Sequence, residues 1–317
     1  MEASPAMKVT NSGNEALFRL DGVPPLGTAL SLALQHLVAT MVGCVTPAII
    51  IGNAIGLSQS DQVFLIQASL VMSAVSTLLQ LYPIAGRFGS GLPVIMGVSF
   101  AYVPSMQAVA AAGEGISAIT GAMIVGGVVA ILVGLFVKRI RPLFPPVITG
   151  TVVFTIGLSL YPTAINYMAG GTGNTYEVVS ASGLSLSLVY GSWQNWLMAA
   201  ITLAAVMILN HHAKGLCKLA SILIGMAFGY VVSMAFGMVS FADVADAAWF
   251  SVPKFLHFGV TFEPASCIAI GLLFAINSIQ AIGDFTATTI GGLNREPTTR
   301  ELQGGIVCYG ATNILAA

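Results

Sequence analysis

Four polar side chains recur along one stretch of an otherwise apolar segment near the C-terminal end of the sequence. Asn277, Gln280, Asp284 and Thr288 are spaced i, i+3, i+7 and i+11, so they share one face of a helix. Such a stripe offers amide and hydroxyl groups that can hydrogen-bond a ligand, and one carboxyl group that can carry a proton. An acid within an apolar segment indicates a functional site by default.

The same acid also has a structural interpretation. Asp284 lies near one end of its apolar segment, where it could cap the helix or pair with Arg295 or Arg300. Both interpretations place the carboxyl group against protein or water, because an isolated charge in lipid is unfavourable.

Two further segments carry polar or helix-breaking residues that a plain apolar helix does not need. Gln35 and His36 are adjacent, and they point about 100° apart on a helix, so both cannot face one ligand equally. Between Pro93 and Pro104 the chain holds β-branched and aromatic residues, among them Phe100, which disfavour a continuous helix. The alternatives are a packing histidine in the first segment and a proline-kinked helix in the second.

The elements that carry these residues are long apolar runs. Only 7% of the 317 residues are charged, 56% are hydrophobic, the net charge is −1 and the mean hydropathy is +0.90. A helix needs about 20 apolar residues to cross the hydrocarbon core of a bilayer. The sequence therefore predicts an all-α polytopic membrane protein and excludes a basic surface for nucleic acid. We expect about nine spans, at 28–51, 62–82, 92–112, 118–137, 145–162, 194–210, 216–237, 265–286 and 303–317.

Charge in the loops predicts the orientation. Every lysine and arginine except Lys254 falls on one side of these spans, so we expect a cytoplasmic N-terminus, with residues 1–27 as a cytoplasmic tail. The segment 163–193 is rich in Gly, Ser and Thr, and it predicts an exterior polar loop. The four cysteines have no paired spacing, so we expect no disulfide, no metal site and no cofactor.

Several short motifs occur in a characteristic order: Gln35-His36, GSGLP at 89–93 with Ser99-Phe100, FPPVITG at 144–150 with IGLS at 156–159, and AIGD at 281–284. Through them the chain resembles the nucleobase–ascorbate transporter family, also called nucleobase:cation symporter-2, and most closely its bacterial urate and xanthine permeases. The resemblance covers essentially the whole chain.

The resemblance implies a fold of two inverted seven-span repeats, divided into a core and a gate. Residues 28–237 would be the first repeat, with core spans one to four and gate spans five to seven. Residues 238–317 would begin the second repeat, with an outer segment, span eight and part of span nine. A short strand would interrupt span three. Spans ten to fourteen would then be absent, and the chain as given would be a fragment that does not transport by itself.

The resemblance also implies secondary active transport of a purine nucleobase such as xanthine or urate, coupled to a proton or to sodium. The protein would be a homodimer in the bacterial inner membrane. Phe100 would pack on the base, and Gln280 would replace the glutamate that usually binds substrate. The remaining expected substrate contacts are Ser99 and His36, and the expected coupling or structural polar residues are Asp284, Gln35, Asn277 and Tyr309.

Other functions stay open at this stage. An amide at Gln280 can pair a purine edge but cannot titrate, so Asp284 is the first candidate for coupling and His36 the second. A uracil or other nucleobase permease would share these residues. An inorganic-anion carrier of the related sulfate-permease architecture is disfavoured, since the third and eighth spans lack a cation. A membrane enzyme would need a cluster of His, Asp or Glu at a membrane face.

Overall fold

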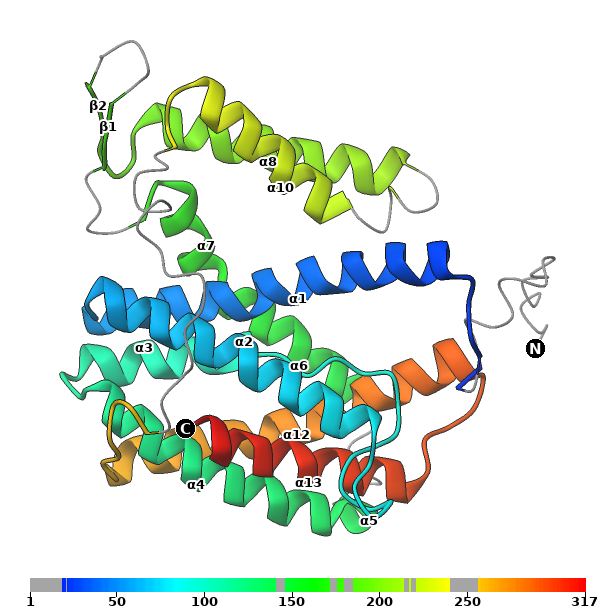
Figure 1. Cartoon of the computed structure of the whole chain (residues 1–317). Helices are drawn as coiled ribbons and strands as arrows, with labels where there is room; N and C mark the ends of the chain where they lie inside the picture. The colour runs from blue at the N-terminus through cyan, green and yellow to red at the C-terminus, as the bar shows by residue number, and fades with distance from the viewer. Residues whose placement is uncertain are drawn as a thin grey trace. The chain divides into compact units, whose positions relative to one another are not determined.

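The computed structural model describes residues 19–20, 22–140, 146–171, 176–179, 185–213, 217, 221–239 and 256–317. The chain divides into two compact units (Figure 1). One comprises Met1–His36, Thr40–Ile156 and Val252–Ala317, and the other comprises Leu37–Ala39 and Gly157–Ser251. Most of the expected tail at 1–27 and most of the expected outer segment after residue 238 lie outside the described residues.

The first unit contains the helices that carry the candidate residues. Helix α4 packs along both α12 and α13, and α13 also contacts α2 (Figure 1). A buried apolar cluster that includes Leu92, Phe285 and Ile306 joins α12 and α13 to the segment after α2. The elements are α1 (Leu26–Ile55), α2 (Gln59–Leu81), the 3-10 turn η2 (Phe100–Tyr102), α3 (Val103–Ala111), α4 (Ile116–Leu135), α5 (Val137–Ile140), most of α6 (Pro146–Ser159), α12 (Pro264–Leu293) and α13 (Thr299–Ala316).

Glycines allow α4 and α13 to pack at very short distance. A Cβ atom added to Gly127 would lie 2.7 Å from the carbonyl oxygen of Gly310. A Cβ atom added to Gly310 would lie 2.6 Å from the carbonyl oxygen of Gly127. Small residues at such contacts let two helix backbones approach closely, which is a usual way for helices to associate within lipid.

The second unit contains α7 (Tyr161–Met168), strands β1 (Tyr176–Val179) and β2 (Ser185–Leu188), α8 (Trp193–His212) and α10 (Ser221–Ala235). Helix α8 packs against α10, and β1 pairs antiparallel with β2. The prediction of a loop at 163–193 is therefore wrong where α7 and the two strands form, and residues 172–175 and 180–184 lie outside the described residues. Pro162, in the first turn of α7, suits a helix start, and the two strands are short runs that hydrogen-bond to each other.

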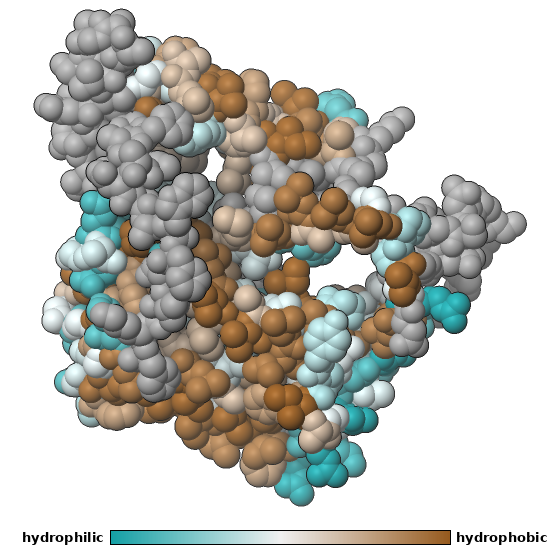
Figure 2. Space-filling model, in the orientation of Figure 1, coloured by the Kyte–Doolittle hydropathy of each residue, from teal (hydrophilic) through white to brown (hydrophobic). Residues whose placement is uncertain are grey.

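Several of the described helices have the length and the surface of membrane spans. Four of them, α2, α4, α8 and α12, are long and apolar enough to cross a bilayer, and the stretches Gly43–Ile55 and Ile224–Ala235 are shorter apolar helices. Hydrophobic residues cover much of the face seen in Figure 2. Leu78 of α2 is 56% exposed and Leu132 of α4 is 50% exposed, which suits lipid rather than water. The prediction of a helical polytopic membrane protein is confirmed.

The third expected span departs from a helix as the sequence predicts. Residues 89–99 are not helical, and they lead into η2 and α3. The short strand expected there is not formed, because within the described residues no neighbouring strand runs beside this segment; the isolated bridge nearby joins Ile84 to Phe88. Elsewhere helices are longer than expected: α1 continues through Pro47 without a break, and α12 extends to Leu293.

Candidate functional site

The extended segment after α2 obtains its hydrogen bonds from side chains of α2. Thr77 Oγ1 accepts a hydrogen bond from the Met96 amide at 2.9 Å and donates one to the Met96 carbonyl oxygen at 3.3 Å. Ser73 Oγ donates to the same carbonyl oxygen at 2.5 Å. Backbone that is not helical survives at membrane depth only where such partners exist. These hydroxyl groups therefore make the irregular third span possible.

Gln80 stabilises the start of the same segment. Its side chain is fully buried, its Oε1 atom accepts a hydrogen bond from the Ser90 amide at 3.0 Å, and its Nε2 atom donates to the Gly305 carbonyl oxygen at 3.4 Å. Gln80, Thr77 and Ser73 are not among the site residues predicted from the sequence. Their spacing of i, i+4 and i+7 along α2 is the signal that marks one polar face.

A closed ring of hydrogen bonds joins the third span to α12 and α13. Ser99 is the N-cap of η2, and its Oγ atom accepts a hydrogen bond from the Ala101 amide at 3.3 Å and donates one to Asn277 Oδ1 at 3.2 Å. Asn277 Nδ2 donates to the hydroxyl oxygen of Tyr309 at 2.8 Å. The hydroxyl groups of Tyr309 and Tyr102 also bond to each other, which returns the ring to η2. Three residues expected from the sequence thus meet, and Tyr102 is an additional member.

Aromatic packing surrounds this polar ring. The Phe274 side chain is fully buried on α12, and its ring centroid lies 4.6 Å from that of Tyr102 and 5.9 Å from that of Tyr309. Contacts of this kind stabilise aromatic pairs beyond the burial of their area. The hydroxyl groups of the two tyrosines are therefore enclosed by apolar surface, where an unpaired polar group is unfavourable.

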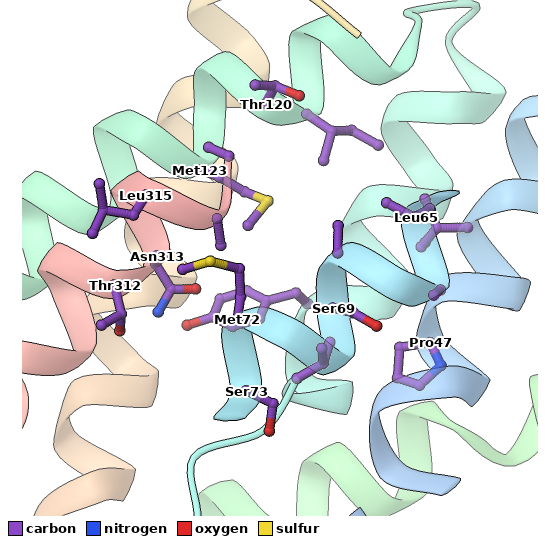
Figure 3. A pocket seen from close by; sticks show the side chains of 18 of the residues that line it. Pro47, Leu65, Ser69, Met72, Ser73, Thr120, Met123, Thr312, Asn313 and Leu315 are labelled. Carbon is purple, nitrogen blue, oxygen red and sulfur yellow. The ribbon is translucent and has the colours of Figure 1, made fainter. Parts of the chain in front are cut away.

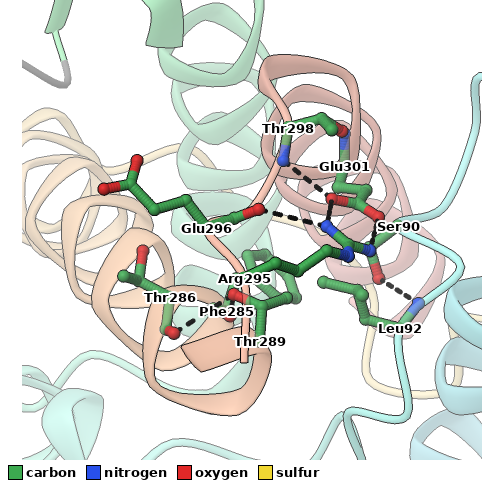
Figure 4. Close-up of polar contacts among 9 residues, drawn as sticks. All are labelled: Ser90, Leu92, Phe285, Thr286, Thr289, Arg295, Glu296, Thr298 and Glu301. Carbon is green, nitrogen blue, oxygen red and sulfur yellow. Dashed lines mark hydrogen bonds and ion pairs between the residues drawn. The ribbon is translucent and has the colours of Figure 1, made fainter. Parts of the chain in front are cut away.

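The other expected residues of α12 lie in different surroundings. Gln280, one turn after Asn277, has a buried Oε1 atom without a hydrogen-bond partner among the described residues. The side chain of Asp284 is exposed in the described structure. Its interpretation as a partner of the nearby arginines is wrong. Arg295 pairs with Glu301 at 2.5 Å (Figure 4), and Arg300 Nε donates to the Gly86 carbonyl oxygen at 2.6 Å.

The two candidates of the first span are not joined to this ring. His36 is exposed on α1, and its Nδ1 atom lies 2.8 Å from the Leu32 carbonyl oxygen of the same helix. The side chain of Gln35 lies outside the described residues. Phe100 directly follows Ser99 in the chain and is half-buried in η2. The structure therefore brings together Ser99, Asn277 and Tyr309, with Phe100 and Gln280 close to them in sequence.

A cavity of about 400 Å³ lies beside the ring, and Ser99, Tyr102 and Tyr309 contribute to its wall. Its volume falls within the range of about 300–1,000 Å³ that is usual for ligand sites. The wall is mainly apolar with a few hydroxyl and amide groups, a composition that suits a flat ligand with polar edges. Figure 3 shows lining side chains from α1, α2, α4 and α13: Pro47, Leu65, Ser69, Met72, Ser73, Thr120, Met123, Thr312, Asn313 and Leu315.

The described part of the chain contains no cluster of metal ligands and no disulfide bond. No group of three or more His, Cys, Asp or Glu side chains there could hold a metal ion, and the four cysteines are unpaired.

The chain is similar in sequence to several known proteins. The model of the Permease family matches residues 27–317. The chain is 33% identical to the xanthine permease of Bacillus subtilis over 91% of its own length and 63% of that protein's length. It is 35% identical to the uric acid permease PucJ of the same organism, over 85% of the chain and 58% of the relative. It is 28% identical to the xanthine permease XanQ of Escherichia coli, over 98% of the chain and 66% of the relative.

Proposed function

Because the chain belongs to the Permease family, the nucleobase–ascorbate transporter group that its motifs resemble, we propose that it acts in secondary transport of purine nucleobases such as xanthine or urate. The chain spans about 58–66% of the length of the relatives compared above. Transport is therefore proposed for the whole protein to which this sequence corresponds. The relatives named as xanthine and uric acid permeases support the substrate class.

The observation that carries the proposal is the amide oxygen of Gln280, which has no hydrogen-bond partner in the described part of the chain. A buried acceptor without a donor destabilises a protein by about 1–3 kcal/mol. The N–H groups along the edge of a purine are donors of the kind that this oxygen lacks. Gln280 lies one turn after Asn277, which belongs to the hydrogen-bond ring beside the cavity. This position supports a substrate that contacts both Gln280 and the ring.

The other expected residues take roles in the same proposal. Phe100 would pack on the face of the base, Ser99 would lie at its edge, and His36 would complete the site from the first span. Asp284 would bind the coupling proton, because a group that can titrate is required and Gln280 cannot do so. We also propose that the N-terminus is cytoplasmic and that the protein is a homodimer in the bacterial inner membrane.

The two compact units support the proposed division into core and gate. The first unit combines the segments assigned to spans one to four with those assigned to spans eight and nine, and the second unit holds the segments assigned to spans six and seven. Span five does not follow this division, because its residues up to Ile156 belong to the first unit. Transport would follow if substrate and proton bound one arrangement of these units more tightly than another.

Uptake of labelled xanthine and uric acid tests the proposal. Cells that lack their own purine permeases would express the gene from which this sequence derives, and uptake would be measured with and without a protonophore. We expect uptake that saturates with substrate and is abolished by the protonophore. Uptake of sulfate in place of purines would overturn the proposal in favour of an anion carrier. Uptake of uracil alone would change the substrate class.

A further inference from the structure

We propose that Tyr309 is a positioning residue for the purine site, because it closes the hydrogen-bond ring that fixes the turn around Phe100. The proposal rests on the function proposed above, and it gives Tyr309, which lies in the cavity wall, the role of orienting Phe100. Tyr309 lies on α13, whereas Phe100 lies in η2, more than two hundred positions earlier in the chain. The hydrogen-bond ring of Ser99, Asn277, Tyr309 and Tyr102 links α13 to this turn.

The ring holds the chain on both sides of Phe100, through Ser99 directly before it and Tyr102 two positions after it. On one side, Ser99 is bonded to Asn277 Oδ1 and to the Ala101 amide. On the other side, Tyr102 is bonded through its hydroxyl group to Tyr309. The backbone of the turn adds a bond from the Tyr102 amide to the Ser99 carbonyl oxygen at 3.4 Å. Phe100 therefore sits within a short turn whose two ends are tied to different helices.

Tyr309 is the member that joins the two halves of the ring. Its hydroxyl oxygen accepts the bond from Asn277 Nδ2 and also bonds to Tyr102. Without this hydroxyl group, Asn277 would still hold Ser99, but Tyr102 would lose its hydrogen bond to α13. The side chains of Tyr102 and Tyr309 are both buried, so water has little access to replace the lost bonds.

The surroundings make the ring rigid. Phe274 packs against both tyrosine rings, and the glycine contact beside Tyr309, at Gly310, holds α13 close to α4. A site that recognises a flat base needs its stacking partner in one orientation, since a misplaced group loses much of its effect. The ring supplies that orientation from the wall of the cavity.

The experiment measures the order of Phe100 and the binding of substrate separately. A 4-fluorophenylalanine placed at position 100 of the whole protein to which this sequence corresponds, in lipid nanodiscs, would report its environment by fluorine NMR. Binding of labelled xanthine would be measured on the same samples. In Tyr309→Phe we expect a broadened or second fluorine resonance and about a two- to tenfold weaker xanthine affinity, with the number of sites unchanged.

Three further variants make the result specific. Tyr102→Phe removes the same hydroxyl–hydroxyl bond from the other side, so it should reproduce both effects. Ser278→Ala removes a fully buried hydroxyl group next to Asn277 that bonds within its own helix, to the Phe274 carbonyl oxygen. Tyr82→Phe removes the hydroxyl group of an exposed tyrosine. The last two should change neither the fluorine spectrum nor the affinity.

The possible outcomes separate the two proposals. If both tyrosine variants leave the fluorine resonance and the affinity unchanged while Phe100→Ala weakens binding, the positioning role is wrong and the purine site stands. If the unaltered chain binds no purine but the fluorine resonance changes in both variants, the ring orders Phe100 and the proposed substrate is wrong. An unchanged resonance overturns the positioning role in either case.

Discussion

Thr77 Oγ1 serves both backbone groups of Met96, accepting from its amide at 2.9 Å and donating to its carbonyl oxygen at 3.3 Å. One hydroxyl group on α2 thus does for Met96 what a neighbouring strand would do in a sheet. With Ser73 and Gln80 it explains how an extended segment can lie among helices without a strand beside it.

Replacing Thr77 by Val should destabilise the chain by about 1–3 kcal/mol, because the part-buried Met96 amide loses its partner and the Met96 carbonyl oxygen keeps only the bond from Ser73, while the shape of the side chain is kept. Thermal unfolding in detergent would measure the change. Thr120→Val is the matched control, since the Thr120 hydroxyl bonds to the Ile116 carbonyl oxygen within its own helix. Equal losses in the two variants would contradict the role of Thr77.

Gly310→Ala should destabilise the chain by about 1–3 kcal/mol, because the new methyl group meets the backbone of α4, which has no room to move. Gly43→Ala, in α1, meets no atom within 4 Å and should be neutral or stabilising by up to about 1 kcal/mol. Unfolding in detergent would compare them. A tolerated Gly310→Ala would show that α4 and α13 are less closely packed than described.

Glu301 should make stability depend on pH in the acid range. The hydrogen bond from Arg295 is the main cause that lowers the pKa of Glu301 from 4.5 to about 2, and Thr298 completes a capping box with Glu301 (Figure 4). Because the folded-state pKa is lowered, the stabilisation is present in full above pH 4.5 and is lost as the pH falls towards 2.

The variant Glu301→Gln tests this dependence. It should unfold at a lower temperature than the unaltered chain at pH 7, and the difference should shrink between pH 4.5 and pH 2.5. Glu263→Gln is the control, since Glu263 precedes α12 without a side-chain capping bond. A difference that is constant over this range would show that the charge of Glu301 does not contribute.

Gln280→Leu should weaken xanthine binding by about tenfold or more if its amide oxygen accepts a hydrogen bond from the substrate, since about 1.4 kcal/mol corresponds to a factor of ten. Gln280→Glu should instead change the affinity and make it depend on pH. Equilibrium binding at several pH values would measure both. If neither variant changed the affinity, Gln280 would not belong to the site.

The sequence predicts the helices of this protein well, because lipid requires long apolar runs with little charge. Gln80 was missed because the partner of a buried amide depends on packing between segments far apart in sequence, here α2 and α13. The spacing of the polar residues predicts one polar face on α12, but these residues lie in different surroundings. Asn277 belongs to the hydrogen-bond ring, the Gln280 amide oxygen is buried and Asp284 is exposed. Spacing assigns residues to a face, but the neighbouring helices decide what each of them meets.

The contact between Gly127 and Gly310 has a mechanical consequence. With no side chains between them, the two helices have no rotamers whose rearrangement could absorb a shift, so α13 and α4 must translate together. Tyr309 is next to Gly310, and its hydrogen bond to Tyr102 restrains the turn that contains Phe100. The thermal motion of the Phe100 side chain should therefore be as small as that of its backbone. The conformational entropy that Phe100 loses when a planar ligand binds to it should then be small.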